Sequence, residues 1–114
     1  MSPEKRVERE QLLKKTSEDF VQAAVQKQWG DIFKVSDGSY STTEALRDHL
    51  QKPWNPDTPL TDGSIASMAW VDDGLAKVKV NWLFQTGSVQ SFSSETFVWV
   101  WKGGGWKYSG RTLR

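Results

Sequence analysis

The pattern of apolar and polar positions changes its period once along the chain, near Gly63. Before this glycine, Leu13, Phe20 and Ala24 recur near helical spacing on one stripe of a mostly charged segment. After it, apolar and polar residues alternate, as in strands with one buried face. These patterns predict helices over 3–28, 31–35 and 42–51, followed by strands over 65–71, 75–84, 89–101 and 106–113.

The residues at the predicted helix ends suit their positions. Ser2 is expected to cap the first helix, and Gly30 to end it. Asp31 then caps the short second helix. Ser41 and Glu44 match the capping box, in which each side chain bonds the other residue's backbone N–H, so we expect the third helix to begin there.

A proline-rich loop separates the helices from the strands. Residues 53–59 contain three prolines, which exclude regular secondary structure, and one tryptophan, Trp54. A stiff loop that carries one large aromatic side chain is suited to act as a lid or a plug. Trp54 has no place in a periodic pattern that would predict its burial.

The third predicted strand has two apolar faces, because Phe97, Trp99 and Trp101 alternate with two valines. Helices can cover only one face of a single sheet. We expect the three aromatic side chains on the outer face, with Lys77 and Lys79 of the neighbouring strand at the rim. Such a patch is typical of an interaction site, and it predicts a homodimer through the face of the sheet.

Two ionisable residues are candidates for chemistry. Glu95 shares its face with Phe97 and Trp99, so alternation favours an outward side chain that offsets Lys77 or Lys79. If Glu95 instead faces inward, burial would raise its pKa and make it a candidate general base. His49 is either a proton shuttle or, as we favour, a half-buried residue bonded to the backbone.

Composition narrows the classes of function. The 114 residues suit one domain over 1–114, and the net charge of +1 argues against a nucleic-acid binder. The charge is unevenly spread, since residues 1–76 carry nine basic and thirteen acidic residues, whereas 77–114 carry six and one. Without cysteine and with a single histidine, neither a disulfide nor a metal site is expected, and no cofactor is implied.

No apolar run approaches the roughly 20 residues of a membrane-spanning helix, so no membrane partner is expected. The charged first residues do not resemble a signal peptide. We therefore expect a cytoplasmic protein, and leave open that a leader precedes the given sequence.

Two motifs carry a family resemblance. Trp29-Gly30-Asp31 resembles the glycine–aspartate step after the first helix of the NTF2-like (cystatin-like) superfamily, which includes ketosteroid isomerase and polyketide-cyclase-like enzymes. The segment 97–108, Phe-Val-Trp-Val-Trp-Lys-Gly-Gly-Gly-Trp-Lys-Tyr, is similar to the end of many members. The resemblance covers nearly the whole chain and implies an α+β cone, with N-terminal helices packed on a strongly curved antiparallel sheet.

The resemblance implies a fold but no reaction. Members that are enzymes usually keep a hairpin near a catalytic carboxylate, and here that region is compressed to 36–40, so no catalytic residue is carried over. We favour a non-catalytic module that dimerises or docks to a protein, and leave open whether the chain is an enzyme.

The alternative is a binder of small hydrophobic ligands, or an isomerase- or cyclase-like enzyme, that uses the open end of the cone. Tyr40, His49, Trp54 and Trp82 would line that pocket. A cavity of roughly 300 Å³ or more with converging polar groups favours this alternative. An interior filled by Trp54 and core aromatic residues favours the module.

Overall fold

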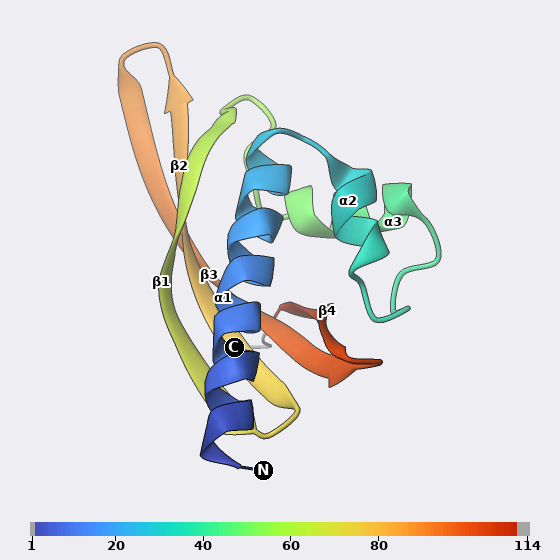
Figure 1. Ribbon diagram of the computed structural model, residues 1–114. Coiled ribbons are helices and arrows are strands. Elements are labelled where there is room, and N and C mark those ends of the chain that lie inside the picture. Colours follow the sequence, from blue (N-terminus) through green and yellow to red (C-terminus); the bar gives the residue numbers. More distant parts are fainter. Residues whose placement is uncertain (1, 112–114) are drawn as a thin grey trace.

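The computed structural model describes residues 2–111, with three helices and a four-stranded antiparallel sheet. The helices are α1 (Pro3–Val25), α2 (Trp29–Lys34) and α3 (Thr43–Gln51). The strands are β1 (Leu60–Asp72), β2 (Leu75–Thr86), β3 (Val89–Lys102) and β4 (Gly105–Arg111). The helices pack on one face of the sheet, with α1 running along it and α2 and α3 near one end (Figure 1). This architecture confirms the predicted α+β class.

The first helix ends earlier than predicted. Lys27 has a positive φ of 60°, and the N–H of Gln28 reaches back to Ala23 O over 2.7 Å. This left-handed residue turns the chain and leaves Gly30 inside α2. The predictions that Gly30 ends α1 and that Asp31 caps α2 are therefore wrong.

Side chains cap the other two helix starts. Ser2 Oγ accepts a bond from the N–H of Lys5 over 3.3 Å at the start of α1, as predicted. At α3 the cap is Thr42, whose Oγ1 accepts from the N–H of Ala45 over 3.0 Å. The capping box predicted from Ser41 is one residue out of position, because the cap lies at the following residue.

The sheet has the strand order β1-β2-β3-β4, in which each strand pairs with the next one in sequence. The chain after α2 covers the β4 edge: Tyr108 donates its N–H to Val35 O over 2.7 Å, and Asp37 donates its N–H to Tyr108 O over 2.9 Å. β1 forms the opposite edge and begins at Leu60, five residues earlier than predicted. The last predicted strand extends to 113, and its final two residues lie outside the described part of the chain.

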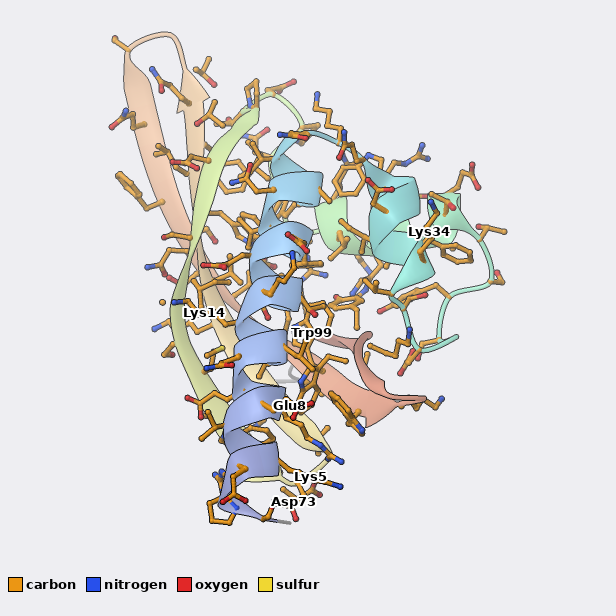
Figure 2. All side chains as sticks on the ribbon, in the orientation of Figure 1. Lys5, Glu8, Lys14, Lys34, Asp73 and Trp99 are labelled. Atoms are coloured by element: carbon orange, nitrogen blue, oxygen red, sulfur yellow. The ribbon has the colours of Figure 1, made fainter. Side chains whose placement is uncertain are left out.

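The register of β2 with β3 decides which face of β3 is buried. Val78 pairs with Phe97 and Ala76 pairs with Trp99, and all four side chains are buried. Opposed residues on paired strands share a face, so these aromatic rings stand beside the small inward residues of β2. Trp99 lies on the side of the sheet that α1 covers (Figure 2).

The ring of Phe20 on α1 packs among these aromatic residues. Its centroid lies 5.0 Å from that of Phe97, 5.5 Å from that of Trp99 and 5.3 Å from that of Tyr108. Trp101 is half-buried on the same side, with the Arg9 guanidinium 4.4 Å from its ring centroid. The predicted placement of Phe97, Trp99 and Trp101 on the outer face is therefore wrong.

The face of the sheet that points away from the helices, hereafter the outer face, has a different composition. Lys77 and Lys79 are exposed there, as predicted. By strand register, β2 and β3 also place five apolar side chains on the outer face, of which four are half-buried and one is exposed: Leu75, Leu83, Val98, Val100 and Phe92. Phe92 is 75% exposed.

Candidate functional site

A polar cluster lies on the helix side of the sheet, centred on an ion pair between Glu95 of β3 and Arg111 of β4. Arg111 Nε lies 2.6 Å from Glu95 Oε1, and the two side chains are only 19% and 10% exposed for Arg111 and Glu95, respectively. Glu95 therefore faces inward, and the prediction that it points outward is wrong. Glu95 and Phe97 do share one face of the sheet, as the alternation predicts. That face is the one covered by the helices, and not the outer face.

Two tryptophans complete the surroundings of the carboxylate. Glu95 Oε2 accepts hydrogen bonds from the indole N–H of Trp54 over 2.9 Å and from that of Trp82 over 2.7 Å. Together with Arg111, three donors point at one carboxylate. A carboxylate offers about four lone-pair sites on its two oxygens, so it can accept all three bonds.

Arg111 also ties β4 to the end of α3. One terminal nitrogen donates to His49 O over 2.7 Å and the other to Leu50 O over 2.5 Å. The last carbonyls of a helix lack partners within the helix and carry the negative end of its dipole. The guanidinium therefore satisfies these carbonyls and neutralises Glu95 at the same time.

His49 and two tyrosines lie beside the ion pair. His49 Nε2 is 2.9 Å from the Tyr108 hydroxyl, and the ring of Tyr40 stacks at a tilt with its centroid 4.8 Å from that of His49. Burial lowers the pKa of His49, and the positive charge of Arg111 lowers it further. Burial raises the pKa of Tyr108 and of Tyr40. All three side chains are therefore held neutral near pH 7.

Trp54 extends from the proline-rich loop and covers the polar cluster beside Glu95. Its ring meets those of Trp82 and Phe84 edge to face, at centroid distances of 5.5 and 5.7 Å. Two cavities of about 190 Å³ each flank it. Lys27 and Trp29 help to line one of them; the other lies against β3.

The four predicted pocket residues come together, but they do not form an open pocket. Trp82 is fully buried, and neither cavity beside Trp54 is lined by Tyr40 or His49. Larger hollows of about 430 and 750 Å³ lie along α1, beside α2 and β1, away from the polar cluster. The interior at this end is filled by side chains that bond to one another.

Arg111 belongs to the polar cluster but was not predicted from the sequence. In β4 the buried Trp106 and Tyr108 alternate with outward residues, which would place position 111 outward. A register shift between Val98 and Trp99 moves the alternation by one residue, so that Arg111 lies opposite Phe97. Strand alternation alone gives no sign of this bulge.

Within residues 2–111, no group of three His, Cys, Asp or Glu side chains is placed to hold a metal ion. Over the same residues, none of the helices has the length and apolar character needed to cross a membrane.

No family model matches this chain, and no curated protein matches it in sequence. Among solved structures it is similar to a SEC-C motif-containing protein from Rhodopseudomonas palustris, determined in solution. The two share 13% identity with a TM-score of 0.59, over 82% of this chain and 71% of that one. At this identity the similarity concerns the fold alone.

Proposed function

We propose that this chain is a non-catalytic domain of the NTF2-like type, which docks to a second protein chain through the outer face of its sheet. In the simplest case the second chain is another copy of itself. One observation carries the proposal: the helices cover one face of the sheet, while the outer face keeps adjoining aliphatic side chains toward one end of β2 and β3, and Phe92, 75% exposed, toward the other end.

The composition of the outer face suits a protein interface. Apolar side chains of neighbouring strands adjoin there: Leu75 lies opposite Val100, and Leu83 lies opposite Phe92. Lys79 and Asn81 of β2 are exposed between these two apolar pairs. Apolar side chains beside charged ones are the usual composition of an interface, and two-fold pairing is the commonest way for one patch to meet its like.

The polar cluster supports a role without catalysis. A general base needs a free lone pair aimed at a substrate, and a nucleophile needs an adjacent base. Glu95 instead accepts from Arg111 and from two indoles, and Arg111 is occupied by the carbonyls of α3. A cluster whose groups satisfy one another stabilises the fold and offers no reactive group.

The NTF2-like assignment within this proposal has two supports. The first is the order of the elements, with helices preceding an antiparallel meander that they cover on one face. The second is the pair of sequence motifs at 29–31 and 97–108.

Sedimentation equilibrium at micromolar concentration tests the proposal. Val98→Glu places a charge among the aliphatic side chains of the outer face, whereas Val7→Glu changes a 56% exposed valine on α1 and serves as its matched control. We expect the wild type and Val7→Glu to sediment at twice the 13.0 kDa chain mass, and Val98→Glu as a monomer. A monomeric wild type, or a Val98→Glu variant that still dimerises, would contradict pairing through this face.

A further inference from the structure

We propose that the slot filled by Trp54 is a binding site for a small planar aromatic molecule with one N–H or O–H donor, of the indole or phenol class. Such a molecule would take the place of the Trp54 side chain. This inference is independent of docking through the outer face, because it concerns the opposite side of the sheet.

The slot has the shape and polarity of an indole site. Trp82 and Phe84 provide aromatic walls at centroid distances of 5.5 and 5.7 Å, in the edge-to-face geometry that aromatic pairs prefer. Glu95 Oε2 provides one acceptor, 2.9 Å from the ring nitrogen of Trp54. A few apolar walls with one placed polar group are typical of small-molecule sites.

The structure that holds this acceptor does not depend on Trp54. Trp82 is fully buried and donates to the same carboxylate oxygen, while Arg111 Nε holds the other oxygen over 2.6 Å. Glu95 and Trp82 both lie on strands in the middle of the sheet. Trp82 and Glu95 therefore keep their positions when the indole of Trp54 leaves the slot.

Trp54 occupies the slot as a side chain inserted from the surface. Its neighbours Pro53, Asn55 and Pro56 are exposed, while Trp54 itself is half-buried. The loop is attached to β2 further along the chain, where Gln85 donates its N–H to Pro59 O over 3.0 Å. Withdrawing Trp54 consequently displaces a short exposed segment and leaves the core in place.

The two cavities beside Trp54 give a ligand room beyond the indole itself. Each holds about 190 Å³, and both are lined by Trp54 and Phe84. Removing the Trp54 ring would join them across the slot. Substituents on the ring of a ligand could then extend toward Lys27 and Trp29 on one side, or toward Ser91 and Ser93 on the other.

The carboxylate predicts selectivity for molecules with a donor. A ligand that lacks the donor would bury one side of Glu95 Oε2 without replacing the bond from Trp54. Sites built around a buried hydrogen bond discriminate strongly against analogues that lack the group. Indole and 1-methylindole share a ring system and differ in this donor, so they form a matched pair of probes.

The test follows the indole N–H resonances of ¹⁵N-tryptophan-labelled protein as each probe is added to millimolar concentration. For the wild type we expect saturable shifts of the Trp54 and Trp82 resonances with indole, and at least tenfold weaker binding of 1-methylindole. Trp54→Gly should bind indole more tightly than the wild type, because the internal side chain no longer competes. Trp70→Gly, which removes a half-buried tryptophan from β1 outside this slot, should leave indole affinity unchanged.

Three results would each overturn the proposal: no saturable shift in the wild type, equal affinity for the two probes, or equal indole affinity in Trp54→Gly and Trp70→Gly. The first would show that Trp54 is a permanent plug. If Trp54→Gly does not fold, the comparison of the two probes on the wild type decides alone.

Discussion

Arg111 and Glu95 form an ion pair on the helix side of the sheet, with Nε and Oε1 2.6 Å apart. This contact joins β3 to β4, and through the other nitrogens of Arg111 it joins both strands to the last turn of α3. Through Glu95 it also fixes two tryptophans. The packing of α3 and Trp54 against the sheet depends on this pair.

Removing one charge of this pair should destabilise the fold. Glu95→Gln leaves Arg111 largely buried without its anion, so we expect a loss of about 2–4 kcal/mol in the free energy of unfolding, measured by urea denaturation. Asp19→Asn is the control, because its ion pair with Lys15 is exposed at the surface, and should change stability by less than about 0.5 kcal/mol. Similar losses in both variants would contradict the structural role of Glu95.

Two glycines should respond to alanine in opposite directions. A Cβ at Gly63 would lie 2.7 Å from the Trp82 ring and 2.8 Å from Val21, so Gly63→Ala should cost about 1–3 kcal/mol. A Cβ at Gly30 meets nothing within 4 Å, and this residue lies in α2. Gly30→Ala should therefore raise stability by roughly 0.5–1 kcal/mol. Thermal unfolding measures both, and a harmless Gly63→Ala would show that α1 lies farther from β1 and β2.

The left-handed residue at the end of α1 offers a third test. A lysine at φ 60° has a steric cost that glycine avoids. Lys27→Gly should therefore raise the free energy of unfolding by about 0.5–1 kcal/mol, whereas the neighbouring Lys34→Gly, inside α2, should lower it by a similar amount. A destabilised Lys27→Gly variant would mean that α1 does not end in this conformation.

His49 should make stability depend on pH. Its pKa in the folded protein is lowered by burial and by Arg111, whereas the unfolded chain has the ordinary value near 6.5. Between these two values the unfolded state binds more protons, so stability is complete above about pH 6.5 and falls as the pH drops below it. The tyrosines beside His49 stay neutral in this range, and Glu95 is the nearby anion.

His49→Gln should reduce the slope of stability against pH between about 7 and 5, as followed by urea denaturation at each pH. The chain has no other histidine, so the difference between the two proteins reports on this residue alone. An unchanged slope would show that His49 is accessible to protons in the folded state.

Sequence periodicity predicted the α+β class and the type of every element, because the helical and strand periods each extend over many residues. It could not determine the register between strands. The tight turn between β2 and β3 pairs Thr86 with Val89 and so places Phe97 beside Val78. A turn one residue longer would have sent Phe97 and Trp99 to the outer face, as we had predicted.

The candidate site could be predicted only in part, because its other residues depend on strand register. Tyr40, His49, Trp54 and Trp82 were identified as neighbours, because the predicted helices and strands bring them to one end. Glu95 was placed on the wrong face by the register error, and Arg111 was hidden by the bulge opposite Val98 and Trp99. The closed network depends on both residues, which is why the sequence left a ligand pocket open as the alternative to a filled interior.

Docking of a second chain on the outer face of the sheet, as proposed above, would cover that face in solution. The most direct measurement is the broadening of methyl resonances by a soluble paramagnetic agent, recorded over a dilution series. We predict that the methyl groups of Val98, Val100 and Leu83 are protected at high concentration and become broadened on dilution, while those of the exposed Val7 are broadened throughout. Equal broadening of all four residues at every concentration would contradict docking through the outer face.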